Sequence, residues 1–438
     1  MSVWRIMALV VCFAFFGIVA LANSIMALSL GTTHYLMILW LLVPVPLIFL
    51  VLRFRAPRMK AIRVLGYSYL GVSIFVTTIL WGVGWYFSDV LKDGALVPDY
   101  TPPEYDLQVG DIQEGYVTLY PTSDAEADGP WTRDGTWGLE WSRGYDQVGK
   151  IVEITEDRVV REYMPISGGL NEGELVRLDS WAFAGDPLQA FGIPFQEVSY
   201  SSPVGDFPAW LVNGTDPTWV IFVHGKGAER GQALRMVPTM AEMGYPFMVI
   251  TYRNDEGVPS DKDGFYRYGQ TEYEDLEYAV TYALDHGADQ VVLAGYSMGG
   301  AIIAKFLCDS PIADNVSGVI LDAPMMNFSA TVDLGASQKG YPVFISAIGQ
   351  AVSSYRFGIH WEALNYLKRT DRLSSPILLF HGDADIKVPI TTSDALAEAR
   401  SDIVTYVIVE GARHNCAWNT APDSYEAAVR DFLMQVAP

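Results

Sequence analysis

The stretch Gln290-Val-Val-Leu-Ala-Gly-Tyr-Ser-Met-Gly-Gly300 decides the fold. Its apolar first half is typical of a buried strand, and Ala301–Leu307 continues directly from the glycines with a helical pattern. Gly295 and Gly299 stand where such a strand and helix cross too closely for side chains, so the serine between them occupies a sharp turn. Its hydroxyl projects at the amino end of the helix, where backbone amides favour negative charge. We therefore predict that Ser297 is a nucleophile and that Gly295 and Gly299 shape its elbow.

Strand and helix patterns alternate on both sides of this turn, from about residue 196 to the end of the chain. Apolar runs typical of buried strands occur at residues 219–223, 247–251, 316–321, 377–380 and 404–409. Helical patterns occur at residues 272–285 and 424–435. This alternation predicts a mostly parallel sheet that is covered by helices on both faces.

A nucleophilic serine needs a base, and the base needs a third group that orients it. In a sheet of this kind the expected chain order is serine, then Asp or Glu, then histidine. Of the six histidines, only His414 follows the last predicted strand and precedes the closing helix. For the acid, Asp383 and Asp385 both follow the strand at 377–380, and position alone leaves that choice open.

A resemblance to a known family bears on this choice. The segment His381-Gly-Asp-Ala-Asp-Ile-Lys-Val-Pro389 resembles the His-Gly-x-x-Asp-x-x-Val-Pro signature of α/β-hydrolases, particularly of the esterase and prolyl-oligopeptidase-like branches. The resemblance covers residues 196–438 and implies the α/β-hydrolase fold. It also implies that Asp385 is the acid of the triad and that Asp383 is a turn or capping residue.

The same resemblance implies an oxyanion hole made by two backbone amides. One belongs to Met298, the residue after the nucleophile. The other lies just past the strand that ends in His224-Gly225, and by position it belongs to Lys226. The glycines near Lys226 do not have the spacing of a P-loop or of a dinucleotide-binding motif. We expect no cofactor and no metal.

The amino-terminal part of the chain has a different composition. Residues 6–33, 35–52 and 64–87 are apolar runs without charged side chains, and each is long enough for a transmembrane helix. Because residues 53–63 are rich in Lys and Arg, the positive-inside rule places them in the cytoplasm and the catalytic domain on the other side. Ala20-Leu21-Ala22 resembles a signal-peptidase site, so cleavage of the first span remains open. These patterns predict a multi-pass membrane protein with an extracytoplasmic catalytic domain.

Four regions follow from these patterns. We predict a transmembrane region at 1–87, a linker at 88–105, a β-rich region at 106–195 and a hydrolase domain at 196–438. An apolar insertion at 322–374 is the expected position of a lid over the nucleophile.

Charge and motif together restrict the function. All 51 Asp and Glu residues lie after residue 87, and a domain this acidic repels nucleic acids. The prediction is a membrane-anchored serine hydrolase that cleaves a carboxylic ester or a peptide-like amide through an acyl-enzyme. The expected partners are an ester, lipid or peptide substrate and the lipid bilayer. Two alternatives remain: an acyltransferase of the cell envelope with the same triad, and a catalytically inactive binding domain.

Overall fold

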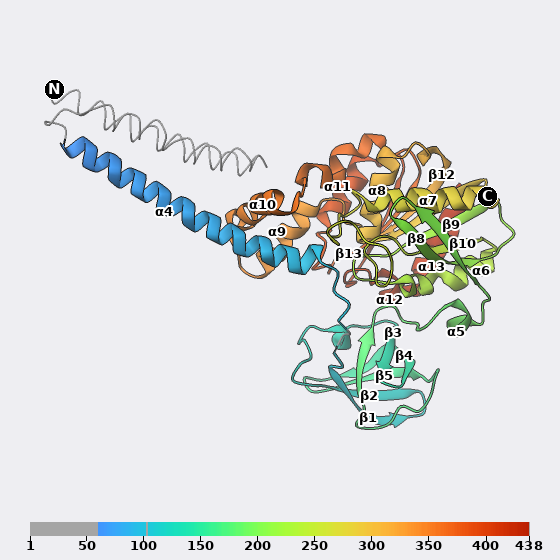
Figure 1. The fold of residues 1–438 in the computed structure, drawn as a ribbon. Coiled ribbons are helices and arrows are strands. Elements are labelled where there is room, and N and C mark those ends of the chain that lie inside the picture. Colours follow the sequence, from blue (N-terminus) through green and yellow to red (C-terminus); the bar gives the residue numbers. More distant parts are fainter. Residues whose placement is uncertain (1–59, 102–103, 438) are drawn as a thin grey trace. The chain divides into compact units, whose positions relative to one another are not determined.

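A computed structural model of the protein describes residues 60–101 and 104–437. The chain divides into two compact units. The first contains Met1–Ala95 and Gly335–Trp361, and the second contains Leu96–Leu334 and Glu362–Pro438. Figure 1 shows the long helix of the first unit and the mixed sheet and barrel of the second.

The described part of the first unit is built mainly on the helices α4 (Lys60–Leu91) and α10 (Val343–Phe357). They cross closely at Gly84, where a Cβ atom would lie only 2.5 Å from the Val352 side chain. Arg356 joins the same helices, because its guanidinium donates to Asp89 at 2.8 Å and lies 3.9 Å from the centre of the Trp85 ring. A five-residue π-helix, Lys92–Leu96, continues from α4.

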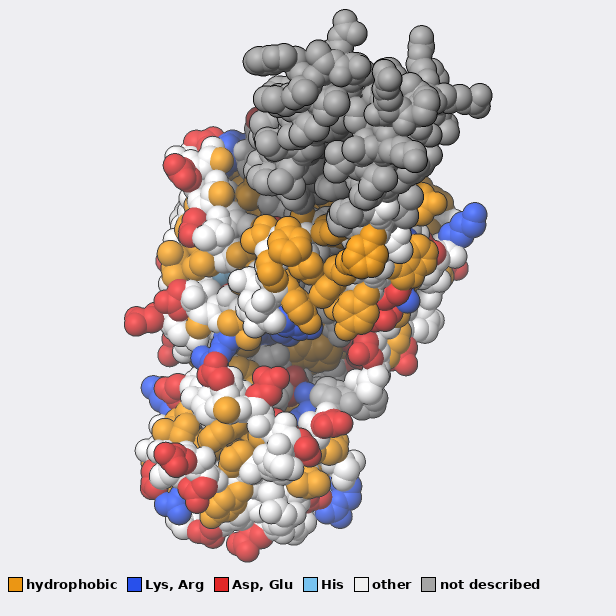
Figure 2. Space-filling view, turned by 90° about the vertical axis from the view of Figure 1, so that its left-hand side faces the viewer, with side chains coloured by type: hydrophobic (Ala, Val, Ile, Leu, Met, Phe, Trp, Pro, Cys, Tyr) orange, Lys and Arg blue, Asp and Glu red, His pale blue; other side chains and the backbone are white. Residues whose placement is uncertain are grey.

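Large apolar side chains are exposed on this unit. Figure 2 shows a face of the molecule on which hydrophobic side chains gather. The exposed apolar side chains of α4, α10 and the turn before α10 include Phe75, Ile79, Trp85, Tyr86, Tyr341, Val343, Phe344 and Tyr355.

The predicted membrane topology is contradicted. Within residues 60–101 and 104–437, no helix is both long enough and apolar enough to cross a membrane. The multi-pass, extracytoplasmic localisation is therefore wrong, and the predicted bilayer partner has no support. The third predicted span, 64–87, lies in α4, whose carboxyl-terminal part packs on α10. A run without charge suits such helix packing as well as it suits a bilayer. The predicted spans 6–33 and 35–52, and the possible cleavage site, lie outside the described residues.

In the second unit, the strands between Leu107 and Asp179 close into an antiparallel barrel with the order β1-β2-β5-β4-β3-β6. Side chains alternate along β2 between the inside and the outside of the barrel. Val117 and Leu119 are fully buried in its interior, whereas Tyr116 and Tyr120 are exposed. Three tryptophans fill much of the interior. The strands are β1 (Leu107–Gln113), β2 (Tyr116–Pro121), β3 (Trp137–Trp141), β4 (Gly144–Ile154), β5 (Val159–Met164) and β6 (Leu175–Asp179), and the core tryptophans are Trp131, Trp137 and Trp141.

An eight-stranded sheet forms the rest of the second unit, in the order β14-β13-β12-β11-β9-β10-β8-β7. The strands β7 and β8 form an antiparallel hairpin at one edge. The other six strands, β9 to β14, pair in parallel with one another. This strand order is that of the α/β-hydrolase fold. The strands are β7 (Gln196–Ser202), β8 (Gly205–Val212), β9 (Thr218–Val223), β10 (Phe247–Ile250), β11 (Gln290–Tyr296), β12 (Val316–Asp322), β13 (Ile377–Gly382) and β14 (Val404–Val409).

Helices cover both faces of this sheet (Figure 1). Alternate strand residues such as Phe222, Ala294 and Phe380 share one apolar core with side chains of α6 and α13, while α7 and α8 pack together on the sheet. The longer helices are α6 (Val237–Met243), α7 (Glu272–Asp285), α8 (Met298–Asp309), α9 (Phe328–Gln338), α11 (Thr391–Ala399) and α13 (Pro422–Val436). Short helices are η3 (Pro130–Thr132), α5 (Pro187–Phe191), η4 (Arg230–Met236), η5 (Ala313–Asn315), η6 (Trp361–Leu364), η7 (Tyr366–Arg372) and α12 (Ala417–Thr420).

The predicted lid segment, 322–374, is mostly helical. It contains α9, α10, η6 and η7. Because α10 belongs to the first unit, the segment is divided between the two units. Its role as a lid stays a prediction.

Candidate active site

The turn between β11 and α8 holds Ser297 in a strained conformation. Its backbone angles are φ 51° and ψ −112°, which are unfavourable for a residue with a side chain. Glycines make this turn possible. A Cβ atom on Gly299 would lie 2.1 Å from the carbonyl oxygen of Val223, and one on Gly295 would lie 2.9 Å from the backbone of Gly299. The two predicted elbow glycines thus stand at contacts that exclude any side chain.

Three predicted residues form a continuous hydrogen-bonded chain. Ser297 Oγ lies 2.8 Å from His414 Nε2, and His414 Nδ1 lies 2.7 Å from Asp385 Oδ2. The serine follows β11, the aspartate follows β13 and the histidine follows β14, so the sheet brings together residues that are up to 117 positions apart. An ionised carboxylate only accepts hydrogen bonds, so His414 carries its proton on Nδ1. The Nε2 atom is then left to accept the hydrogen bond of the Ser297 hydroxyl.

The surroundings of Asp385 keep it ionised. Its Oδ1 atom accepts from the amides of Lys387 at 2.7 Å and Val388 at 3.0 Å, and its Oδ2 atom lies 3.2 Å from His381 Nε2. Burial alone would raise the pKa of this carboxyl, but the hydrogen bonds from His381 and His414 hold the pKa well below its ordinary value. Asp385 is therefore a carboxylate throughout the neutral range.

The competing aspartate occupies a different position. Asp383 is exposed, and its Oδ1 atom accepts from the amide of Gly411 at 2.7 Å. Gly411 lies in the turn between β14 and His414. Asp383 thus stabilises the turn that leads to the histidine and makes no contact with the imidazole.

The residues that follow β9 lie against Ser297. A Cβ atom on Gly225 would lie 3.3 Å from Ser297 Cβ, so this residue lets the chain pass directly beside the serine. Lys226, the predicted second oxyanion donor, follows immediately. Met298, the predicted first donor, begins α8, and the first amides of a helix have no acceptor within the helix. Burial lowers the pKa of the Lys226 ammonium group, and the nearby Asp99 opposes this change.

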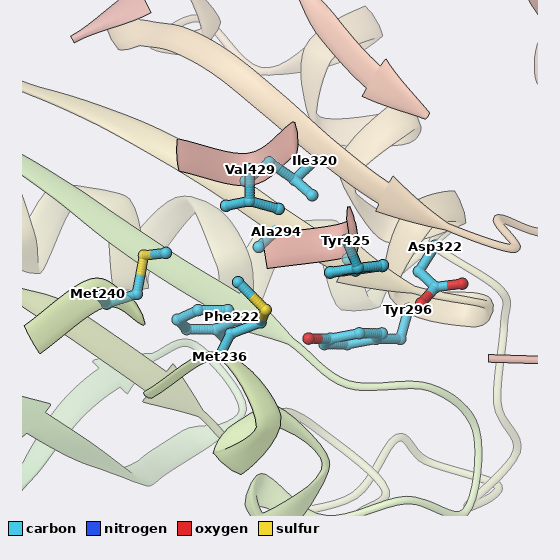
Figure 3. A pocket seen from close by; sticks show the side chains of 10 residues that line it. Phe222, Met236, Met240, Ala294, Tyr296, Ile320, Asp322, Tyr425 and Val429 are labelled. Carbon is cyan, nitrogen blue, oxygen red and sulfur yellow. The ribbon is translucent and has the colours of Figure 1, made fainter. Parts of the chain in front are cut away.

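A buried carboxyl lies on the strand beside Ser297, β12. Asp322 pairs in register with Tyr296 and is 1% exposed. Within the described part of the chain, its carboxyl oxygens make no hydrogen bond of ordinary geometry, although the Tyr425 hydroxyl interacts with this carboxyl. Burial raises its pKa to about 6, and the strongest opposing effect comes from Arg235. Figure 3 shows the small cavity that Asp322 and Tyr296 border, with Met236, Met240 and other apolar side chains around it.

The barrel contacts the loop that carries the histidine. Cys416, two residues after His414, is buried with the apolar core of the barrel. The Asn419 side chain is fully buried and donates 2.8 Å hydrogen bonds to the carbonyls of Thr136 and Ser180. Together these contacts attach the loop of the base to the barrel.

Sequence reasoning missed several of these residues. Position among the predicted strands does not indicate the contact of His381 with Asp385. Arg235, Asp322 and Asn419 lie outside any recognisable motif, so only the three-dimensional structure shows their proximity to the triad. Within the described residues, no group of three or more His, Cys, Asp or Glu side chains could hold a metal ion.

Comparisons with known proteins agree with this architecture. Residues 216–361 match a hydrolase family described as serine aminopeptidase S33, and this match contains Ser297 but ends before Asp385 and His414. Residues 108–179, which form the barrel, match a domain family of unknown function. An uncharacterised Bacillus subtilis protein, YqkD, is 21% identical over 223 residues, which are 50% of this chain and 71% of that protein.

Solved structures that are similar to part of the chain include two esterases. Esterase Pf2001 of Pyrococcus furiosus is 18% identical with a TM-score of 0.47, covering 58% of this chain and 98% of that one. Esterase RhEst1 of a Rhodococcus species is 15% identical with a TM-score of 0.39, covering 55% of this chain and 99% of that one. The family match and the strand order support an α/β-hydrolase domain with hydrolase activity.

Proposed function

We propose that the protein is a serine hydrolase that cleaves a carboxylic ester or a peptide-like amide through an acyl-enzyme on Ser297. The observation that carries this proposal is the chain of hydrogen bonds from Ser297 Oγ through His414 to Asp385. A serine hydroxyl is a weak nucleophile, and a neutral imidazole within 2.8 Å is positioned to take its proton. The ionised Asp385 then stabilises the imidazolium that forms.

The reaction has two half-reactions. In the first, Ser297 Oγ bonds to the carbonyl carbon and its proton moves to His414 Nε2. The tetrahedral oxyanion is held by the amides of Met298 and Lys226, and its collapse expels the alcohol or amine, which takes the proton from His414. In the second, a water molecule attacks the acyl-enzyme in the same way and releases the carboxylic acid.

Labelling with a fluorophosphonate tests the nucleophile directly. The wild-type protein should form one covalent adduct, and mass spectrometry of the digested protein should place it on Ser297, because only an activated serine attacks phosphorus readily. Ser297→Ala should remove the labelling and the hydrolysis of p-nitrophenyl esters. Persistent labelling of this folded variant would refute the proposal.

A matched pair of variants tests the acid. Asp385→Asn should lower kcat by roughly 10⁴-fold, because the amide favours the wrong imidazole tautomer. Asp383→Asn should lower kcat far less, since Asp383 contacts the Gly411 turn and not the imidazole. If Asp383→Asn has the larger effect, the acid has been assigned to the wrong residue.

A further inference from the structure

The short helix η4 carries two buried polar side chains that reach toward different parts of the active site. Gln232 is 4% exposed and Arg235 is 2% exposed. Residues three apart in a 3₁₀-helix lie on the same side of it, so both side chains leave η4 in a similar direction. Burying an arginine is costly unless its donors are used, so this arrangement needs a structural or functional reason.

Gln232 holds the loop of the predicted oxyanion hole. Its Oε1 atom accepts from the amide of Gly225 at 2.8 Å. Gly225 is the residue that passes beside Ser297 and immediately precedes Lys226. By holding the Gly225 amide, Gln232 also restricts the orientation of the next peptide unit, which carries the amide of Lys226.

Arg235 holds the loop of the base. Its Nη1 atom donates to the carbonyl of Asn415 at 2.7 Å and to Asn419 Oδ1 at 2.9 Å. Asn415 follows His414 directly and has a positive φ of 56°, and the Arg235 hydrogen bond to its carbonyl fixes this turn beside the imidazole. The Arg235 guanidinium also lies 5.2 Å from the ring centre of Tyr296, the residue before the nucleophile.

We propose that Gln232 and Arg235 are positioning residues that together set the geometry between the oxyanion hole and the catalytic histidine. One helical turn connects the two side chains, so a displacement of either loop is transmitted to the other through η4. Neither residue touches substrate. The proposal rests on the proposed function of Ser297, His414 and Asp385.

Transition-state stabilisation is the quantity that such positioning affects. A misplaced oxyanion donor or imidazole weakens the tetrahedral intermediate more than it weakens the bound ester. Loss of one oxyanion donor lowers kcat by about 10²- to 10³-fold in a serine protease. A donor that is still present but poorly placed should cost less, on the order of 10- to 100-fold.

The experiment compares variants that keep or remove each contact. Gln232→Leu removes the acceptor of the Gly225 amide, whereas Gln232→Glu keeps an acceptor oxygen at the same distance from the backbone. Arg235→Met removes the donor to Asn415, whereas Arg235→Lys keeps a cationic donor. The control is Thr239→Val on α6, which removes an equally buried hydroxyl that contacts Glu426 at 3.1 Å, away from the triad.

Kinetics with a p-nitrophenyl ester and inhibition by a trifluoromethyl ketone, which mimics the tetrahedral intermediate, supply the readouts. Gln232→Leu and Arg235→Met should lower kcat on the order of 10- to 100-fold, weaken the ketone by a similar factor and change KM by less than about threefold. Gln232→Glu and Arg235→Lys should recover part of kcat. Thr239→Val should lower the melting temperature without these kinetic changes.

The outcomes below distinguish failure of the positioning proposal from failure of the proposed function. If the Leu and Met variants fold but keep kcat and ketone affinity within about twofold of wild type, the positioning role is refuted while Ser297 labelling still stands. If either variant does not fold, Gln232→Ala or Arg235→Gln, which also weakens the contact, decides: kcat and ketone affinity within about twofold of wild type, with a lowered melting temperature, would show a purely structural role. If the fluorophosphonate does not label Ser297 in the wild-type protein, the proposed function itself is refuted.

Discussion

Replacing Asp322 by asparagine should stabilise the protein at alkaline pH. This carboxyl is 1% exposed, and within the described part of the chain it makes no hydrogen bond of ordinary geometry, although the Tyr425 hydroxyl interacts with it. Burial raises its pKa from 3.8 to about 6, although Arg235 opposes that change. The folded protein therefore holds a proton on Asp322 more tightly than the unfolded chain does. Asparagine keeps the shape of the side chain and removes the charge.

The sign of the effect follows from linkage. A group whose pKa is higher in the folded state destabilises the fold as pH rises above its unfolded value. The difference is about two pKa units, and each unit corresponds to about 1.4 kcal/mol, so the ionised carboxyl costs about 3 kcal/mol at pH 8. At pH 4 the carboxyl is protonated in the folded state and only partly ionised in the unfolded state. The cost there is below about 1 kcal/mol.

Urea unfolding followed by tryptophan fluorescence measures this difference. The free energy of unfolding of Asp322→Asn should exceed that of the wild type by about 3 kcal/mol at pH 8 and by less than about 1 kcal/mol at pH 4. Asp431→Asn, at an exposed position on α13, is the control and should show no such trend. An advantage for Asp322→Asn that does not grow with pH would refute the reasoning.

Three further predictions concern the elbow and the barrel contact. Gly299→Ala should abolish ester hydrolysis or folding, because the new Cβ would lie 2.1 Å from the Val223 carbonyl oxygen. The control Gly335→Ala in α9 places its Cβ where no atom lies within 4 Å, so the melting temperature should stay unchanged or rise slightly. Asn419→Leu should lower the free energy of unfolding by roughly 2–4 kcal/mol in urea titrations, since two partly buried carbonyls lose the donor that the fully buried Asn419 supplies. Asp128→Ala should change stability by less than about 1 kcal/mol, because the Asp128 carboxylate is largely exposed where it pairs with Arg413 and Arg133. A larger loss would mean that these two ion pairs contribute more than exposed pairs usually do.

Much of the hydrolase domain could be predicted because its signals are local. The strand predicted at 404–409 coincides with β14, and those at 219–223 and 316–321 differ from β9 and β12 by one residue at one end. Parallel strands buried on both faces appear as continuous apolar runs, which are easy to recognise. Order and position also predict Ser297 and His414, which lie within hydrogen-bond distance of each other, since the sheet places the carboxyl ends of its strands at one edge.

Other features depend on contacts between distant residues. The hairpin of β7 and β8 was not predicted, because edge strands such as Gln196–Ser202 are half exposed and lack a long apolar run. The choice of acid needed the family resemblance, since Asp383 and Asp385 follow the same strand. The charge-free run at 64–87 was interpreted as a membrane span, although its carboxyl-terminal part packs on α10. Sequence alone does not show which partner an apolar surface has.

The barrel illustrates how a region without a recognised motif can still matter to the chemistry. Its core includes Cys416, whose backbone is two residues from the imidazole that contacts Ser297. Asn419 binds two carbonyls on the barrel side with its amide nitrogen and binds Arg235 with its amide oxygen. A movement of the barrel against the sheet would therefore displace the loop of His414, and through Arg235 it would reach η4 and the loop of Lys226. The barrel and the hydrolase domain should consequently unfold together, and removal of the barrel should inactivate the enzyme even though Ser297, His414 and Asp385 all lie outside it.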